Sequence, residues 1–303
     1  MIKIVYMGTP HYAKEILQTL LDDLEIEVPL VITQPDRKAG RKGALKAPDV
    51  KVLAEAYSLD VLQPQKLSDE GIYEAIVEAK PDFIVVAAFG QMLPKSILNI
   101  APCINLHASL LPAYRGASPI QQSLLNDDEF TGVTAMLMEE GLDSGPILGY
   151  RYFKISSKMI LPELMKRLSE DACRLTIDIV HRFDTIAPIE QNHAVATHCK
   201  KIKKSDGLVS FSDVKILYSK YRSYAGWPGI FLENGVKISD IILYDEHKYE
   251  NSGVILALDK SKVLVSGANG SVEVGTIQVP SKKAVKAKDY CLGKGLKVGD
   301  SLF

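Results

Sequence analysis

The sequence predicts an α/β fold in which a doubly wound, mostly parallel sheet is followed by a small β-barrel domain. Strand and helix patterns alternate along the first half of the chain. Residues 83–88, Phe-Ile-Val-Val-Ala-Ala, form a continuous apolar run, which is typical of a parallel strand covered on both faces. Beyond residue 206 the pattern changes to short alternating strands separated by Asn-Gly turn signals.

The first half is predicted to consist of strand and helix pairs. Residues 2–7 form an apolar strand that ends at Gly8-Thr9-Pro10, and residues 12–21 have apolar side chains at helical spacing. The elements that follow are a strand at 28–33, a helix at 50–57, a short strand at 60–62, a helix at 68–80 capped by Ser68, and strands at 83–88 and 103–107. Because the carboxyl ends of parallel strands meet at one edge of a sheet, we expect a ligand crevice there.

The second half is predicted to contain a closing helix, a linker and a separate small domain. Residues 161–183 form a long amphipathic helix with Pro162 in its first turn. Residues 191–206 are polar and lack periodicity, which is typical of an interdomain linker. A helix at 213–224 follows, and strands at 262–266 and 272–279 flank Asn269-Gly270 and predict a hairpin. The predicted domains are therefore 1–190 and 207–303, joined by the linker 191–206.

The composition is that of an ordinary soluble protein. The chain has 303 residues, 47% hydrophobic and 24% charged, which is enough for two domains with sizeable cores. No apolar run approaches the length that crosses a bilayer, and the N-terminal strand is too short for a signal peptide, so we expect a cytoplasmic protein with no membrane partner. The net charge is -1, so any surface for nucleic acid must be local.

The four cysteines indicate neither a disulfide framework nor a metal site. They are scattered along the chain and form no C-x-x-C pair. His193 and His198 lie near Cys199, but no second cysteine stands at a ligand spacing. We therefore expect no metal, and we interpret these three residues as part of the linker.

Three polar side chains can be brought together at the predicted sheet edge. Residues 103–107 alternate with period two, so Asn105 and His107 project from the same face. Asp143 lies in a loop between two apolar runs, from which its carboxylate can reach His107. Taken singly, each residue is more often structural. Taken together, they offer an amide, a base and a group that orients the base.

The residues around these three resemble the formyltransferases that use 10-formyltetrahydrofolate. The runs SLLPAYRGASPIQ at 109–121 and GLDSG at 141–145 look like the methionyl-tRNA formyltransferases in particular, and the resemblance covers nearly the whole chain. It implies a Rossmann-like catalytic domain, an OB-fold-like tRNA-binding domain, and catalytic roles for Asn105, His107 and Asp143. It also implies 10-formyltetrahydrofolate as the cosubstrate and initiator methionyl-tRNA as the acceptor. The residues implied at the folate are Phe89, Gly90, Gln91, Ser109, Leu110, Leu111, Pro112 and Gly141.

Residues 89–94 are equally suited to a plain turn between a strand and a helix. If they do border the folate, Gly90 lets the ligand approach the backbone closely. The sequence alone leaves both interpretations open.

Two basic stretches are candidates for tRNA contact. Residues 34–46 form a long loop rich in glycine, arginine and lysine, a combination suited to a nucleic-acid backbone. In the resembled family the matching loop enters the acceptor end of the tRNA, so Arg41 is the first candidate for tRNA contact, with Arg37 and Lys42 as supports. A second set, Lys282, Lys283 and Lys286, is assigned to the tRNA backbone, although a run of charges is as often a solvated face.

The predicted mechanism is a direct transfer without a formyl-enzyme intermediate. A free α-amino group titrates at about 7.7 to 8.0, so an imidazole can take its proton near neutral pH. His107 is the expected base, and the Asn105 amide is expected to stabilise the oxyanion. Asp143 is expected to orient His107 and to relay a proton toward the leaving nitrogen.

Three alternative functions would each require different sequence features from those found here. An enzyme for glycinamide ribonucleotide or an amino sugar would need a phosphate grip in the first strand-to-helix turn, where Pro10 removes a donor. A formyltetrahydrofolate hydrolase would not require the basic loop or the small domain. A non-catalytic tRNA-binding module would not need the three catalytic side chains together. At one position the chain departs from the family, since Ala113-Tyr114 replaces the Arg-Trp pair that is common there.

We expect the protein to be a monomer with no obligate protein partner.

Overall fold

The computed structural model describes residues 1–39 and 43–303, which divide into two compact units. The first unit consists of Met1–Pro119, Glu129–Ile155 and Leu164–Lys200. The second unit consists of Lys201–Phe303 and two segments from earlier in the sequence, Ile120–Asp128 and Ser156–Glu163. The expected linker, 191–206, is thus divided between the two units.

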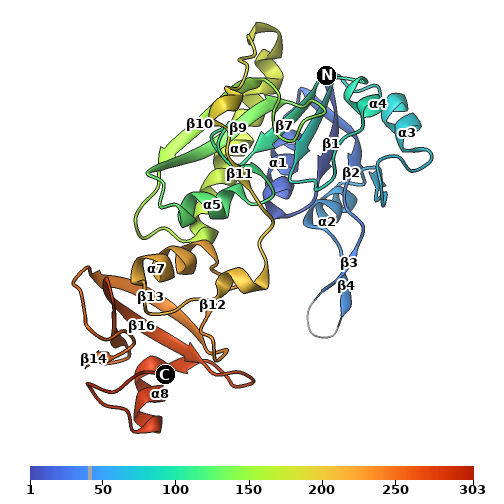
Figure 1. Cartoon of the computed structure of the whole chain (residues 1–303). Coiled ribbons are helices and arrows are strands. Elements are labelled where there is room, and N and C mark those ends of the chain that lie inside the picture. Colours follow the sequence, from blue (N-terminus) through green and yellow to red (C-terminus); the bar gives the residue numbers. More distant parts are fainter. Residues whose placement is uncertain (40–42) are drawn as a thin grey trace. The chain divides into compact units, whose positions relative to one another are not determined.

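Within the described residues, a seven-stranded sheet forms the centre of the first unit (Figure 1). Five neighbouring strands pair in parallel, and the two at one edge pair antiparallel. In spatial order the strands are β10 (Ile147–Lys154), β9 (Phe130–Leu137), β7 (Cys103–His107), β6 (Phe83–Ala87), β1 (Ile2–Gly8), β2 (Ile26–Ile32) and β5 (Val61–Leu62). The mostly parallel sheet predicted from the alternating pattern is therefore confirmed.

Helices cover both faces of this sheet, as a doubly wound fold requires. Val5 and Met7 of β1 belong to a core that includes α3 and α4, while the alternate residue Tyr6 donates from its hydroxyl to Ala13 O of α1 at 2.6 Å. The helices of the first unit are α1 (His11–Leu21), α2 (Asp49–Ala56), α3 (Ile72–Glu78), α4 (Lys95–Leu98) and most of α6 (Leu161–Arg182), whereas α5 (Pro119–Leu125) lies in the second unit from Ile120 on. None of the described helices combines the length and apolar composition needed to cross a bilayer.

The helix expected at 68–80 begins later than predicted. α3 starts at Ile72, after Gly71 takes a φ of 81°, a left-handed conformation that cannot continue a helix. Asp69 closes the preceding turn, where its carboxylate accepts from Lys66 N at 2.9 Å. The prediction that Ser68 caps this helix is therefore wrong.

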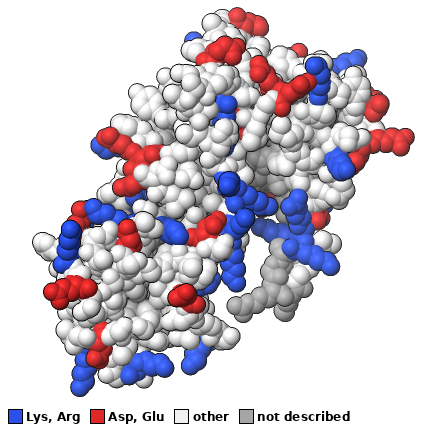
Figure 2. Space-filling view, viewed as in Figure 1, with Lys and Arg blue, Asp and Glu red and all other residues white. Residues whose placement is uncertain are grey.

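The basic stretch 34–46, expected as a loop without regular structure, contains a two-stranded antiparallel ribbon. β3 (Arg37–Ala39) pairs with β4 (Ala44–Lys46). Figure 2 shows Lys and Arg side chains over this ribbon. The described side chains of the ribbon are exposed, so its strands do not show the alternation of apolar and polar residues by which a half-buried strand is recognised.

The second unit is built on an antiparallel sheet. Strands β15 and β16 pair antiparallel, with Gly267 opposite Gly270 on either side of the turn at Asn269, so the predicted hairpin is confirmed. In spatial order the strands are β12 (Ile230–Phe231), β13 (Lys237–Asp245), β16 (Gly270–Gln278), β15 (Val263–Gly267) and β14 (Ile255–Leu258), with β17 (Val285–Lys286) on β16. Helices α7 (Val214–Ser223) and α8 (Ala287–Lys294) add Val214, Leu217, Ala287 and Cys291 to its core.

Asn269 connects the hairpin turn to the start of α7. Its Oδ1 accepts from Val214 N at 2.9 Å, and its Nδ2 donates to Asp213 Oδ1 at 3.0 Å. Asp213 is the N-cap residue and also accepts from Ile216 N at 2.9 Å. The hydrogen bond from Ile216, and then that from Asn269, lower the pKa of the Asp213 carboxyl, against the raising effect of burial.

Arg222 of α7 holds together the three chain segments of the second unit. Its side chain is 3% exposed, and its guanidinium donates to Asp127 Oδ1 at 2.6 Å, to Met159 O at 3.0 Å and to Ser156 O at 3.3 Å. Because the arginine is buried while its acceptors are partly exposed, it is the guanidinium that depends on these three hydrogen bonds. The two early segments are therefore fixed to α7 by one side chain.

We expect the stability of the second unit to depend on the ionisation of Asp213. Its pKa is lower in the folded state than the ordinary value of 3.8, so its contribution is complete above that value and is lost as the pH falls through the folded pKa. Asp213→Asn, which retains a good cap residue, should flatten the decline in Tm as the pH falls below about 4. Calorimetry checks this, with the exposed Asp289→Asn as the control. Equal flattening in both variants would contradict it.

We expect Arg222→Met to lower the free energy of unfolding of the second unit by about 2 kcal/mol, because three hydrogen bonds from a charged donor are lost. Chemical denaturation measures the change. The matched control is Lys215→Met, which removes an exposed pair with Glu246 and should cost less than about 1 kcal/mol. A similar small loss for both variants would show that Arg222 does not join these segments.

Candidate active site

Asn105 and His107 lie on the same face of β7 at its carboxyl end, and Asp143 faces both of them. The Asn105 Nδ2 atom donates to Asp143 Oδ1 at 3.3 Å, and His107 Nδ1 lies 3.7 Å from Asp143 Oδ2. The side chains of His107 and Asp143 are only 7% and 13% exposed. The three side chains that the sequence singled out are therefore brought together by the fold.

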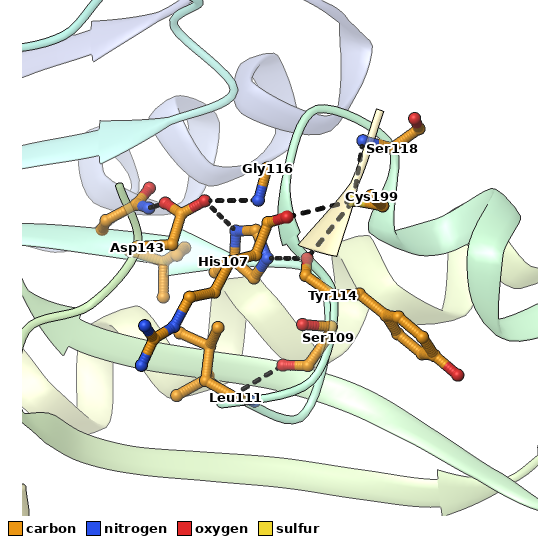
Figure 3. A network of polar contacts seen from close by, with 12 residues as sticks. His107, Ser109, Leu111, Tyr114, Gly116, Ser118, Asp143 and Cys199 are labelled. Carbon is orange, nitrogen blue, oxygen red and sulfur yellow. Dashed lines mark hydrogen bonds and ion pairs between the residues drawn. The ribbon is translucent and has the colours of Figure 1, made fainter. Parts of the chain in front are cut away.

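The Asp143 carboxylate is held by the backbone of a second loop. Its Oδ2 accepts from Gly116 N at 2.7 Å, and Figure 3 shows the carboxylate between this amide and the His107 ring. Gly116 has a φ of 114°, and a Cβ at this position would lie 2.5 Å from Cys199 O. Only glycine fits there, so the amide that holds Asp143 depends on the residue type.

The closest polar partner of the His107 ring is a main-chain carbonyl. Its Nε2 lies 3.0 Å from Tyr114 O, whereas the 3.7 Å between Nδ1 and Asp143 exceeds a hydrogen bond. A carbonyl oxygen only accepts, so this contact places a proton on Nε2 and leaves the lone pair of the neutral ring on Nδ1. Sequence reasoning missed Tyr114 O, because a backbone carbonyl has no residue-type signature.

The segment after His107 folds into a turn around Thr134 of β9. The Thr134 hydroxyl donates to Ser109 O at 2.7 Å and accepts from Leu111 N at 3.0 Å. The Ser109 hydroxyl donates to Ala113 O at 2.6 Å and is buried, so it serves this turn. Of the residues implied at the folate in this segment, Leu110 and Pro112 are partly exposed, while Ser109 and Leu111 are buried.

The second candidate folate loop follows β6 and lies beside the first strand-to-helix turn. Phe89 belongs to the core, and its carbonyl accepts from the Thr9 hydroxyl at 3.2 Å. Gly90 is exposed with a φ of 86°, and a Cβ there would meet no atom within 4 Å. The Gln91 amide is used within the protein, where it accepts from Leu67 N at 3.1 Å and donates to Pro64 O at 3.4 Å. Gly141 is exposed.

Cys199 lies beside the site as a protonated thiol. Its Sγ accepts from Ser118 N at 3.3 Å and lies 3.4 Å from Tyr114 O. Burial raises the pKa of this thiol and the nearby Asp143 carboxylate raises it further, against the lowering effect of Ser118 N–H. It is therefore suited to donate to the Tyr114 carbonyl and unsuited to act as a nucleophile. Among the described residues, no group of His, Cys, Asp and Glu side chains is placed to hold a metal.

The described residues predicted to bind tRNA lie on other elements and loops than Asn105, His107 and Asp143. Arg37 is exposed on β3, where its Nη2 donates to Gln34 Oε1 at 2.8 Å. Arg41 and Lys42 lie outside the described residues. In the second unit, Lys282, Lys283 and Lys286 are all exposed.

Sequence reasoning also missed Gln191, a buried residue that contacts the site loops. Its Nε2 donates to Asp143 O at 3.0 Å, and its Oε1 accepts from Arg115 Nη2 at 2.7 Å. Arg115 Nη2 also lies 3.1 Å from His193 Nδ1. Gln191 and His193 stand in a polar stretch without periodicity, so no local signal distinguished them from linker residues.

Two family profiles match the chain. The profile described as formyl transferase matches residues 2–180, and that described as formyl transferase, C-terminal domain, matches residues 201–295. A methionyl-tRNA formyltransferase of Sulfurovum sp. strain NBC37-1 is 57% identical over 300 residues, which cover 99% of each chain. The methionyl-tRNA formyltransferase of Helicobacter pylori is 45% identical and covers 99% of this chain and 100% of its own.

Solved structures share the fold at lower identity. The N-formyltransferase of Helicobacter canadensis, in complex with folinic acid and dTDP-3-aminofucose, is 18% identical, with a TM-score of 0.68 over 90% of this chain and 98% of its own. HypX of Aquifex aeolicus, in complex with tetrahydrofolic acid, is 17% identical, with a TM-score of 0.62 over 97% of this chain and 48% of HypX. The chain spans about half the length of HypX. With both profiles and the full-length relatives in agreement, the chain belongs to the formyl transferase family, together with the methionyl-tRNA formyltransferases that it matches throughout.

Proposed function

We propose that this enzyme transfers the formyl group of 10-formyltetrahydrofolate to the α-amino group of initiator methionyl-tRNA for translation initiation. The observation that carries the proposal is the match to methionyl-tRNA formyltransferases over the whole chain, at up to 57% identity. The geometry supports the reaction class, because an amide and an imidazole face one carboxylate. The absence of such a set would have favoured a non-catalytic module.

His107 is the proposed base and Asn105 the proposed oxyanion donor. The lone pair on His107 Nδ1 takes the proton of the attacking amine, and the Asp143 carboxylate 3.7 Å away then stabilises the imidazolium. One N–H of the Asn105 amide is donated to Asp143, so the second can donate to the oxyanion. The amine attacks the formyl carbon directly, since the Cys199 thiol is protonated and occupied with backbone groups. The tetrahedral intermediate then collapses, the bond from the formyl carbon to N10 breaks, and the proton taken up by His107 is relayed by way of Asp143 to the leaving N10.

The two substrates are proposed to approach from different loops. Gly90 presents open backbone, and Leu110, Pro112 and Gly141 present partly or fully exposed atoms to the folate. The basic ribbon, through Arg37 and with Arg41 and Lys42 outside the described residues, is assigned to the acceptor end of the tRNA. Lys282, Lys283 and Lys286 are assigned to the tRNA backbone. We further propose that the enzyme is a cytoplasmic monomer.

We expect His107→Ala to lower kcat by about 10²- to 10⁴-fold, because the proposed base is lost. Asn105→Ala should lower it by about 10²- to 10³-fold, because one oxyanion donor is lost. The measurement is label transfer from 10-formyltetrahydrofolate to initiator methionyl-tRNA, with an amino-sugar nucleotide and glycinamide ribonucleotide as alternative acceptors. His181→Gln, at a histidine paired with Asp23, is the control. Transfer to a small amine, or hydrolysis alone, would contradict the proposed acceptor.

We expect Arg37→Ala and Lys38→Ala on β3 to raise the KM for tRNA without changing that for folate. If each contacts one phosphate, each should reduce the slope of log affinity against log salt by about 0.7 to 0.9. Tracking the KM for tRNA at several salt concentrations checks this. Lys154→Ala, at an exposed lysine paired with Glu129, is the matched control. An unchanged slope in both ribbon variants would remove the ribbon from the proposed interface.

A further inference from the structure

The first unit ends in residues 191–200, here called the exit segment, which pair with the loop that carries Tyr114 and Gly116. β11 (His198–Cys199) pairs in parallel with β8 (Arg115–Gly116). Thr197 O accepts from Arg115 N at 2.9 Å, and Thr197 N donates to Pro112 O at 3.2 Å. The exit segment is thus a continuous backbone partner for the loop that contacts His107 and Asp143.

Gln191, at the start of the exit segment, is 4% exposed, and its amide is fully hydrogen-bonded. Nε2 donates to Asp143 O at 3.0 Å and to Gly145 O at 2.7 Å. Oε1 accepts from Arg115 Nη2 at 2.7 Å and from Arg115 Nε at 3.2 Å. One buried side chain therefore fixes the Asp143 loop to the residue that precedes Gly116.

The exit segment also contacts the two residues of the site that have an unfavourable backbone conformation. Asp143 has a φ of 48° and Tyr114 a φ of 61°, in the left-handed region that residues other than glycine rarely adopt. Such conformations persist only where the surroundings hold them, and they cluster at active sites. Gln191 Nε2 bonds Asp143 O, and Thr197 Oγ1 accepts from Tyr114 N at 2.9 Å.

We propose that Gln191 and Thr197 are positioning residues for formyl transfer. Gln191 holds the residue whose carboxylate faces His107 Nδ1, and Thr197 holds the residue whose carbonyl bonds His107 Nε2. The exit segment thereby fixes the surroundings of both ring nitrogens of His107, because Gln191 bonds the backbone carbonyl of Asp143 and Thr197 bonds the backbone amide of Tyr114. The inference rests on the proposed function for the catalytic roles of His107 and Asp143.

Two nearly isosteric variants of the full chain test the inference. Gln191→Met keeps the side-chain volume without its hydrogen bonds, and Thr197→Val removes only the hydroxyl. Each should lower kcat by about 10- to 100-fold while changing either KM by less than about threefold, because a displacement of about 1 Å in a catalytic group has an effect of this size. The matched control is Asn192→Ala, an exposed amide beside Gln191 that accepts from Ala194 N at 3.1 Å. Its kcat should stay within about twofold of the wild type.

A double variant distinguishes a positioning role of Gln191, which acts through Asp143, from a general structural role. In an Asp143→Ala background, Gln191→Met should lower kcat by less than about twofold further, because the group it positions is gone. If Gln191→Met keeps its full effect there, Gln191 does not act through Asp143 and the inference is overturned.

A spectroscopic readout separates this inference from the proposed function. The ¹⁵N resonances of the His107 ring, recorded without substrates at fixed pH, should shift in Gln191→Met and Thr197→Val and remain unchanged in Asn192→Ala. Unchanged resonances together with unchanged kcat in both folded variants would overturn the inference. Failure of the proposed function has another signature, since the wild-type chain would then formylate no tRNA while the His107 resonances still shifted in the two variants.

Discussion

The geometry of the site depends on one hydrogen bond, from Gly116 N to the Asp143 carboxylate at 2.7 Å, which joins two loops 27 residues apart. It fixes one carboxylate oxygen and leaves the other to accept from Asn105. The amide can point this way only because Gly116 has no Cβ to clash with Cys199 O. The Asp143 carboxylate is therefore placed by backbone conformation, and Asn105 and His107 lie against it.

The fold was predictable wherever burial imposed a period on the sequence. The apolar run at 83–88 is strand β6 in the middle of the parallel sheet, and Asn269-Gly270 joins two paired strands. Prediction failed where a single backbone angle or an exposed pairing decided the structure. Gly71 delays the start of α3 through its positive φ, and the β3–β4 ribbon buries no face that could leave a pattern.

The same distinction applies to the site. The meeting of Asn105, His107 and Asp143 was predictable because their residue types suit the proposed reaction and two of them share a strand face. The Tyr114 carbonyl was not, because every residue has one. Gln191 was not, because it stands in a polar stretch and its burial comes from contacts with residues 46 to 76 positions away. Backbone groups and buried polar residues that contact the site are thus less visible in the sequence than side chains recognisable by their residue type.

Because the second unit is built from three separate stretches of the chain, its early segments are synthesised well before the helix that binds them. Arg222 and Asp127 are 95 residues apart, so at about 5 to 20 residues per second the acceptor waits about 5 to 20 s for its donor. In that interval β9 and β10, encoded between the two early segments, can pair within the first sheet. The two early segments are therefore fixed only when α7 arrives, and a chain cut after residue 200 would keep Ile120–Asp128 and Ser156–Glu163 without the helix that binds them.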